Sequence, residues 1–412
     1  MTCASTVALV SRFVQRGAVA GLLAALSAFA AAAPAVLPAT PTTIEGTAER
    51  LISYRHQDHM WQTPDGATHA LVNTGTQPDG AALRLYTSVD NGLTWVPGLA
   101  LANSTEATTS DGFIDGNRLF ATYQTGAGTI VFVRLEYDPV LQTWQPTLRE
   151  AAFQSSTVAG VNPAVARDQQ GRFWLAFTAT DKASGQHSIK MLHRAQDEPW
   201  VDTGLQFGAS DNLAIERSAR PVATPNGMGL VYTVHQTTSW ALRRNDAPLD
   251  AAWASYTVYT RKSPETDPYA SHFNVVADAD NNLHMVVADG GRALYFRQLA
   301  SEGRWRFRMA TESANSVYAQ MVVSGSRLMM IVNSETSLRV FASLDQGSNW
   351  VNTHLLTHPR ATSGISYQRP RVEAPSYAAS PVPVLQQYAE DGVQRLMSFQ
   401  VPVISEAVGS RR

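Results

Sequence analysis

The sequence predicts an all-β protein, a seven-bladed β-propeller in which four-stranded antiparallel blades form a ring. Three observations predict it: a tryptophan that returns about every fifty residues, a repeated turn motif, and a last repeat that lacks one strand. A repeat of this length is typical of propellers and solenoids, because one unit cannot bury its apolar face without its neighbours. A wheel of six blades is the alternative.

Six of the nine tryptophans mark the repeat. They are 49, 56, 53, 52 and 45 residues apart and are Trp95, Trp144, Trp200, Trp253, Trp305 and Trp350. Aligning the chain on them gives seven units, at about 53–95, 108–144, 160–200, 216–253, 271–305, 316–350 and 366–401. Within the units, β-rich runs alternate with turn residues. We expect each tryptophan to pack between adjacent sheets, because its side chain is large.

Two units end in the same eight-residue pattern, S-x-D-x-G-x-T-W. The segment SVDNGLTW at 88–95 fits it fully, and SLDQGSNW at 343–350 departs only at Asn349. An aspartate in a tight turn accepts hydrogen bonds from backbone N–H groups further along, and the glycine supplies a positive φ. We therefore expect two rigid hairpin turns in which Asp90 and Asp345 are structural and not catalytic.

These octapeptides resemble Asp-boxes, also called bacterial neuraminidase repeats, and the units that contain them resemble the sialidase-like β-propeller superfamily. The resemblance covers the chain after about residue 45. It implies a propeller fold. The superfamily includes exo-sialidases, other glycoside hydrolases, polysaccharide lyases, lectins and non-enzymatic assembly factors, so the fold leaves the chemistry open. Sialidases have six blades, one fewer than the repeats predict here.

The N-terminus predicts export. Arg12 and Arg16 precede an apolar run at 17–30 that ends in Ala-Phe-Ala, the pattern of a secretory signal peptide over residues 1–30. A Pro/Ala/Thr spacer at 31–42 should be extended and mobile, followed by one propeller domain at 43–403 and a tail at 404–412. We expect a secreted or periplasmic monomer that is free of the membrane after cleavage. An uncleaved anchor helix is the alternative.

Composition excludes several classes of protein. The single cysteine, Cys3, lies in the predicted signal, so the mature chain has no disulfide and no thiolate metal site. Without Arg12 and Arg16 the chain has 30 basic and 34 acidic residues. The basic residues look scattered, with no cluster interleaved with aromatic residues, so no nucleic-acid partner is expected. No nucleotide-binding, zinc-protease or serine-hydrolase motif is present, and we expect neither a cofactor nor a metal.

The last repeat predicts how the ring closes. Its three strands, at 371–374, 382–388 and 394–399, lack a fourth, and the segment 43–51 can supply it. Such pairing would join the two chain ends in one blade and remove a free sheet edge.

Functional residues are expected where the first strands of the blades converge, because residues there line one shared polar mouth. Polar side chains at these positions include His56, Asp58, Asp111, Asn162, Gln320, Tyr367 and Arg371. The resemblance makes a sialidase-like glycoside hydrolase acting on acidic glycans the leading specific function. In such an enzyme three arginines hold the substrate carboxylate, and a tyrosine activated by a glutamate attacks the sugar. The catalytic candidates are Glu216, Tyr318 and His272, and the substrate-binding candidates are Arg55, His59, Arg220, Asn274, Arg292 and Arg369.

Two alternatives stay open. A polysaccharide lyase acting on uronic acids would use His59, His272 or Tyr318 as base or acid, with Arg220, Asn274 or Arg369 facing the carboxylate. A non-catalytic propeller would bind glycans or proteins through aromatic residues such as Trp61, Trp240 and Tyr318. The expected partner in most of these cases is a glycan or polysaccharide.

Overall fold

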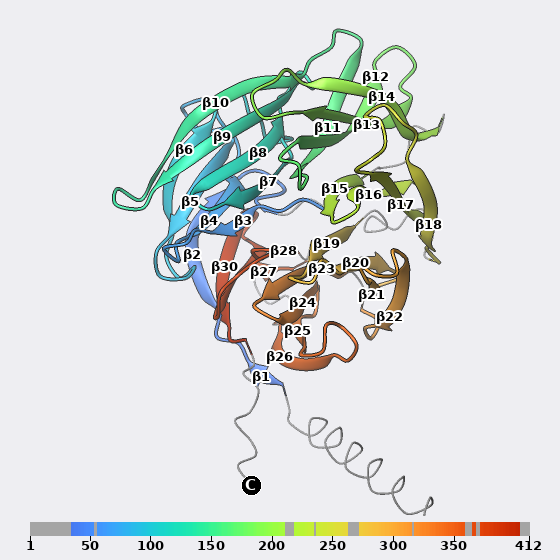
Figure 1. Ribbon diagram of the computed structural model, residues 1–412. Helices are drawn as coiled ribbons and strands as arrows, with labels where there is room; N and C mark the ends of the chain where they lie inside the picture. Colours follow the sequence, from blue (N-terminus) through green and yellow to red (C-terminus); the bar gives the residue numbers. More distant parts are fainter. Residues whose placement is uncertain are drawn as a thin grey trace, which may run out of the picture.

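Seven β-sheets stand in a ring around a central axis in the computed structural model (Figure 1). The model describes residues 34–52, 56–210, 218–234, 236–262, 272–314, 317–358, 365–367 and 371–403. In each sheet successive strands of the chain pair antiparallel from the axis outwards. The predicted seven-bladed propeller is confirmed, and the six-bladed alternative is wrong. Within the described residues no helix is long and apolar enough to cross a membrane.

The first four blades follow one another along the chain. Blade 1 holds β3 (Met60–Gln62), β4 (Thr68–Asn73), β5 (Leu83–Ser88) and β6 (Val96–Leu101). Blade 2 holds β7 (Ser110–Asp115), β8 (Arg118–Gln124), β9 (Ile130–Asp138) and β10 (Thr143–Phe153). Blade 3 holds β11 (Val158–Arg167), β12 (Phe173–Asp181), β13 (His187–Arg194) and β14 (Val201–Ser210). Blade 4 holds β15 (Ser218–Thr224), β16 (Gly227–Val234), β17 (Thr237–Arg244) and β18 (Ala254–Thr260).

The remaining blades include strands from the N-terminal segment. Blade 5 holds β19 (Phe273–Ala277), β20 (Leu283–Asp289), β21 (Arg292–Gln298) and β22 (Trp305–Ala310). Blade 6 holds β23 (Val317–Ser324), β24 (Arg327–Ser334), β25 (Ser337–Ser343) and β26 (Val351–Thr357), with β1 (Ala35–Val36) added parallel to β26. Blade 7 holds β27 (Ile365–Ser366), β28 (Val372–Glu373), β29 (Val382–Glu390), β30 (Val393–Val401) and β2 (Thr40–Gly46).

The two chain ends meet in blade 7, as the last repeat predicts. Thr40 pairs with Ser398, and Gly46 pairs with Gln394. The pairing therefore involves 40–46 instead of 43–51, because the strand begins within the segment where a spacer was expected. Ile44 of this strand is buried at the interface with blade 1, so the closing strand contributes side chains as well as backbone hydrogen bonds.

The core is divided among the blade interfaces. The described residues form seven clusters of buried apolar side chains, and each cluster joins one pair of neighbouring blades. The repeated tryptophans belong to these interfaces, since each packs on the blade before its own. Trp253, for example, lies 5.6 Å from Trp174 between ring centroids, and Trp350 lies 4.8 Å from Tyr295. The tryptophans stand at or beside the start of the outermost strands, so the units predicted to end at them omitted the fourth strand.

The two repeated turns form the expected hydrogen bonds. Asp90 accepts hydrogen bonds from the Thr94 amide at 2.8 Å, the Thr94 hydroxyl at 2.6 Å and the Ser88 hydroxyl at 2.8 Å. Asp345 accepts the equivalent bonds, and Asn349 Nδ2 takes the place of the threonine hydroxyl at 2.6 Å. The single departure from the motif therefore keeps the same contact with a different donor.

Candidate functional site

A ring of equivalent side chains surrounds the axis, one from the first strand of each blade or, in blade 1, from two residues before it. We call these the belt positions: Asp58, Asp111, Ala164, Arg220, Asn274, Gln320 and Glu373. A first strand pairs with only one neighbour, so its other edge presents unpaired amides towards the axis. Side chains at the belt positions are placed to accept hydrogen bonds from those amides.

Four belt side chains bond to the next blade in the same way. Each accepts from the amide of the residue that follows the next belt position: Asp111 from Val165 at 2.8 Å, Asn274 from Met321 at 3.0 Å, Gln320 from Ala374 at 2.6 Å and Glu373 from His59 at 3.1 Å. These bonds link the edges of neighbouring blades around the axis. They explain why polar side chains occur on strands that are otherwise apolar.

Blades 1, 3 and 4 depart from this pattern, and in blade 1 the Asp58 carboxylate bonds to Arg220 instead. Ala164 has no side-chain acceptor, and Pro221, which stands where the donor would be, has no amide hydrogen. The next belt residue, Arg220, is a donor and not an acceptor. It extends across the axis instead of bonding to the next blade.

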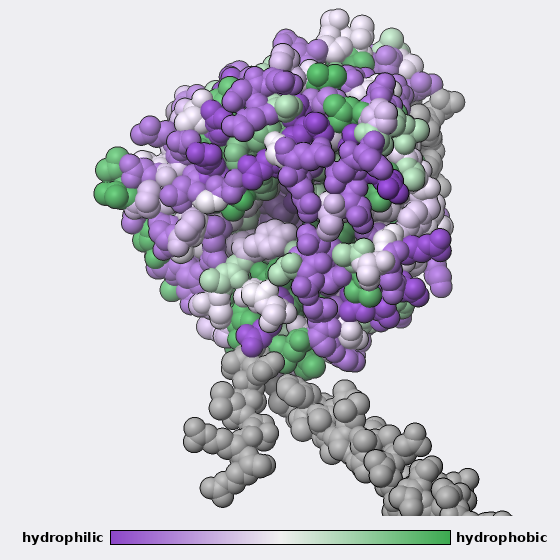
Figure 2. Space-filling model, viewed as in Figure 1, coloured by the Kyte–Doolittle hydropathy of each residue, from purple (hydrophilic) through white to green (hydrophobic). Residues whose placement is uncertain are grey.

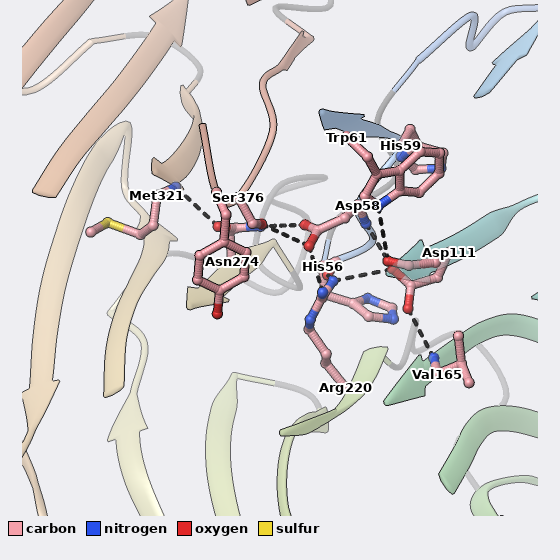
Figure 3. A network of polar contacts seen from close by, with 12 residues as sticks. His56, Asp58, His59, Trp61, Asp111, Val165, Arg220, Asn274, Met321 and Ser376 are labelled. Carbon is pink, nitrogen blue, oxygen red and sulfur yellow. Dashed lines mark hydrogen bonds and ion pairs between the residues drawn. The ribbon is translucent and has the colours of Figure 1, made fainter. Parts of the chain in front are cut away.

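Arg220 lies between two carboxylates from other blades (Figure 3). Its Nη2 donates to Asp58 at 2.5 Å, and its Nη1 donates to Asp111 at 3.2 Å and to the His56 carbonyl at 2.6 Å. Asp58 also accepts from Asn274 Nδ2 at 3.2 Å and from the Ser376 hydroxyl at 2.7 Å. The network thus joins blades 1, 2, 4, 5 and 7 on the axis.

The charges in this network are buried and do not cancel. Asp58, Asp111 and Arg220 are each less than a tenth exposed, and together they carry a formal charge of −1. Burial, helped by the nearby charge of Asp58, raises the pKa of Asp111 to about 6, although the Arg220 guanidinium opposes the shift. Burial alone would lower the pKa of Arg220, but the two carboxylates raise it, so this side chain stays cationic.

A cavity of about 310 Å³ opens on one side of this network. Its inner end is formed by Asp58 and Arg220, and its walls are the later residues of five first strands, including Trp61, Val275 and Ala277. Figure 2 shows a hollow near the middle of the visible face, where the first strands converge in the same view of Figure 1. The cavity therefore extends towards the ends of the first strands, whereas the sequence predicts a mouth at their beginnings.

The loop 374–381 of blade 7 completes the cavity wall. It carries Ser376 and Tyr377, and the Tyr377 side chain lines the cavity while the residue is 58% exposed. The loop is anchored at both ends: the Ser376 carbonyl accepts from the Val323 amide at 2.9 Å, and the Pro381 carbonyl accepts from Asn91 Nδ2 at 2.7 Å. Tyr377 thus stands at a fixed place at the side of the cavity.

The structure brings some of the predicted site residues together. Arg220 and Asn274 meet at Asp58, as described above. His59 lies beside them, with Nδ1 at 3.3 Å from the buried carboxylate of Glu373. His272 and Tyr318 pack edge to face with ring centroids 5.1 Å apart, and Tyr318 is buried in the core between blades 6 and 7.

Other predicted residues lie elsewhere. Arg292 is exposed at the start of β21, a strand that is third from the axis. Arg55, Glu216 and Arg369 lie outside the described residues. The described residues contain no group of three or more His, Cys, Asp or Glu side chains arranged to hold a metal ion.

Sequence reasoning missed several residues of the cavity. Ser376 and Tyr377 are absent from the predicted site because they lie between two predicted strands. The length of that loop is the sequence feature that could have drawn attention to them. Trp61 was predicted to bind sugars only in the non-catalytic alternative, and it lines the cavity. The structural roles of Gln320 and Glu373 follow from the belt, which becomes visible only when the blades are superposed.

Comparison with known proteins supports the fold. No family model matches the chain, and no curated protein matches it significantly. A periplasmic gluconolactonase from Pseudomonas aeruginosa is 14% identical, with a TM-score of 0.50 over 81% of this chain and 96% of its own. AofleA from Arthrobotrys oligospora is 8% identical, with a TM-score of 0.50 over 76% and 89%. A mutant of Trypanosoma rangeli sialidase is 10% identical over 90% and 60%, and its TM-score of 0.47 is too low to bear on function. At these identities the similarity shows that the chain is a β-propeller.

Proposed function

We propose that this propeller binds a small neutral saccharide unit in its axial cavity. The observation that carries the proposal is the combination of groups around that cavity. Asp58, Arg220 and Ser376 supply charged and hydroxyl groups at its inner end, and Trp61 and Tyr377 supply aromatic surface at its side. Ligand sites commonly pair apolar walls with a few convergent polar groups, and aromatic rings pack well against sugar faces.

The charge at the inner end favours a neutral ligand over an acidic one. Arg220 already bonds to Asp58 and Asp111, so it is not free to form a paired contact with a substrate carboxylate. An incoming carboxylate would also face the surplus negative charge. Two like charges 4 Å apart repel by about 4 kcal/mol at an effective dielectric constant of 20. A neutral sugar hydroxyl can instead donate to Asp58 without this cost.

A sialidase-like hydrolase acting on acidic glycans remains the alternative proposal, with a lyase as its variant. Its support is the resemblance of the two turns to Asp-boxes, and their shared hydrogen bonds agree with that interpretation. Among the described candidates, Tyr318 is 1% exposed, and Arg292 lies far out on its blade. Three further predicted site residues, Arg55, Glu216 and Arg369, lie outside the described residues.

Export to the periplasm or the medium also belongs to the proposal. Its support is the basic and apolar pattern of residues 1–30. Mass spectrometry of the protein recovered from cell fractions would find a start near residue 31 if the signal is cleaved.

Calorimetric titration with a panel of sugars tests the binding proposal. Neutral sugars should bind the mature protein more tightly than sialic acid or glucuronic acid. Tyr377→Ala should weaken binding by about tenfold, because it removes aromatic contact area of the kind worth about 1 kcal/mol or more. The control is Tyr256→Ala, which removes another exposed tyrosine, at 41% exposure, from the outer strand β18.

The same panel separates binding from turnover. Release of reducing sugar from sialosides, or ultraviolet absorbance from an unsaturated uronic product, would favour the alternative enzymes. Equal affinity of Tyr377→Ala and the unaltered protein, or preferred binding of acidic sugars, would contradict the axial site for a neutral ligand.

A further inference from the structure

The outermost strand of blade 5 carries an unusual concentration of arginine. Arg306 and Arg308 of β22 and Arg304, which directly precedes the strand, are all exposed, and Phe307 is 55% exposed. The run Arg304-Trp305-Arg306-Phe307-Arg308 interleaves basic and aromatic residues, so the prediction that no such cluster exists is wrong. The chain as a whole has a net charge of −2, and this stripe is therefore a local reversal of sign.

Protection of a sheet edge does not explain the stripe. Charged side chains are one device that prevents exposed edges from pairing with other chains. However, the outer strands β6 and β18 contain no Lys, Arg, Asp or Glu. Since two other blades have uncharged outer strands, protection of the edge does not by itself account for the arginines of blade 5.

The register of the strands adds an unfavourable contact. Arg306 stands directly opposite Arg297 of β21, and like charges at such positions destabilise a sheet. Arg297 Nη1 is directed to the next blade, where it donates to the Gln346 carbonyl at 2.8 Å and the Ser348 hydroxyl at 3.0 Å. Arg306 pairs with the exposed Glu302 at 2.6 Å. Among the described residues neither Arg304 nor Arg308 has a carboxylate within ion-pair distance.

We propose that this stripe, Arg304, Arg306 and Arg308, binds an anionic polysaccharide along the free edge of β22. Guanidinium groups form paired hydrogen bonds with carboxylate or sulfate groups. The three arginines extend over about 13 Å of strand at 3.3 Å per residue, which suits contact with more than one charged sugar. The site is separate from the axial cavity and does not depend on it.

The narrowness of the stripe favours a polysaccharide over a nucleic acid. A DNA duplex carries a charge about every 1.7 Å along its axis and presents it over a broad surface. Docking a duplex on one strand edge would also bring it against the exposed carboxylate of Glu312, two residues after β22. A single polymer chain with more widely spaced charges can follow the edge and avoid this group.

Binding of polygalacturonate and of heparin, measured at about 50 and 200 mM salt, tests the proposal. The unaltered protein should bind at least one of them, and the affinity should fall steeply with salt as counterions are released. Changing Arg304, Arg306 and Arg308 together to Gln should reduce the affinity by about tenfold or more and flatten the salt dependence. Binding of polygalacturonate alone would assign carboxylate as the preferred group, and binding of heparin alone would assign sulfate.

Matched variants guard against unspecific effects. Arg118→Gln with Arg244→Gln removes exposed, carboxylate-paired arginines from blades 2 and 4 and should leave binding unchanged. The triple variant should keep the thermal unfolding profile of the unaltered protein, because its side chains are exposed. The proposal is overturned if neither polymer binds, if the triple variant binds as tightly as the unaltered protein, or if duplex DNA binds as tightly as the polysaccharides.

Discussion

Arg220 is a central residue of the axial network, because two other blades place their carboxylates on it. Sequence order makes it a candidate for gripping a substrate carboxylate, and the structure shows two protein carboxylates already bonded to it. Removing one partner of a buried ion pair is strongly destabilising, because it leaves the other charge buried without compensation. The arginine therefore has a structural role at the inner end of the cavity, whatever ligand the cavity receives.

Replacing Arg220 with methionine should destabilise the fold by about 3–5 kcal/mol at neutral pH, because Asp58 and Asp111 would be left buried without their cation. The loss should shrink in acid. The pKa of Asp111, already about 6, would rise further without the cation. A carboxyl whose pKa is higher in the folded chain than in the unfolded chain stabilises the fold while it is protonated, and this stabilisation is complete below the unfolded-state pKa. The stabilisation is lost as pH rises through the folded-state pKa. Urea unfolding between pH 4 and 7.5 measures the effect.

The control for this substitution lies on the wall of the same cavity. Arg167 pairs with Asp115 at 2.7 Å, but both side chains are about a third or more exposed. Arg167→Met should cost at most about 1 kcal/mol and show little dependence on pH, since exposed ion pairs contribute little. Similar losses for the two variants would mean that the axial network is no more important than a surface pair.

At the scale of elements, the two repeated turns hold the third and fourth strands of blades 1 and 6 together. The Asp carboxylates accept hydrogen bonds from side chains and amides on both sides of the turn. Asn91 and Gln346 have positive φ values of 58° and 55°, and Gly92 and Gly347 follow at 88° and 80°, so two successive residues of each turn are left-handed. A turn of this shape needs its side-chain acceptor to offset the backbone strain.

Asp90→Ala and Asp345→Ala should each lower stability by about 1–3 kcal/mol and leave sugar binding unchanged once the protein is folded. Burial opposes ionisation of these carboxyls, but the hydrogen bonds from Thr94 and Asn349 keep their pKa values below the usual range. Their contribution is therefore present above the unfolded pKa and is lost as pH falls through the folded pKa, opposite in sign to that of Asp111. Thermal unfolding at several pH values checks both parts.

An exposed aspartate outside the turns provides the comparison. Asp246, paired with Arg244 at the surface, should be replaceable by Ala with no measurable change in Tm. If Asp90→Ala kept the Tm and lost ligand binding, the aspartate would have a functional role that the turn geometry does not explain.

For the whole molecule, the sequence predicted the fold well because the repeat has a direct physical cause. Each repeated tryptophan packs on the blade before its own, so its spacing follows the spacing of the blades. The site was predicted less well. Asp58 and Arg220 are 162 residues apart, and their contact depends on blades that are not neighbours. The contact depends also on Ala164, which has no side-chain acceptor, and on Pro221, which has no amide hydrogen. These two absences can be recognised only by comparison with the belt positions of the other blades.

Closure of the ring gives the last prediction. A chain that begins at Ala48 lacks β1 and β2, so it exposes the edge of β30 and loses Leu37 and Ile44, each 2% exposed, from the cores beside blade 7. Compared with a chain that begins at Pro34, it should unfold at lower temperature and aggregate, because an unpaired strand edge can pair with other molecules. Light scattering during thermal unfolding measures both effects.

A milder variant keeps this prediction testable if the short chain fails to fold. Ile44→Ala leaves the backbone pairing of β2 intact and should cost about 2–4 kcal/mol, since it opens a space in the interface between blades 7 and 1. Val36→Ala, at a position 79% exposed on β1, should change little. Equal stability of Ile44→Ala and Val36→Ala would mean that β2 merely covers the edge of β30. A clear difference would mean that the N-terminal strand closes the wheel by packing as well as by hydrogen bonding.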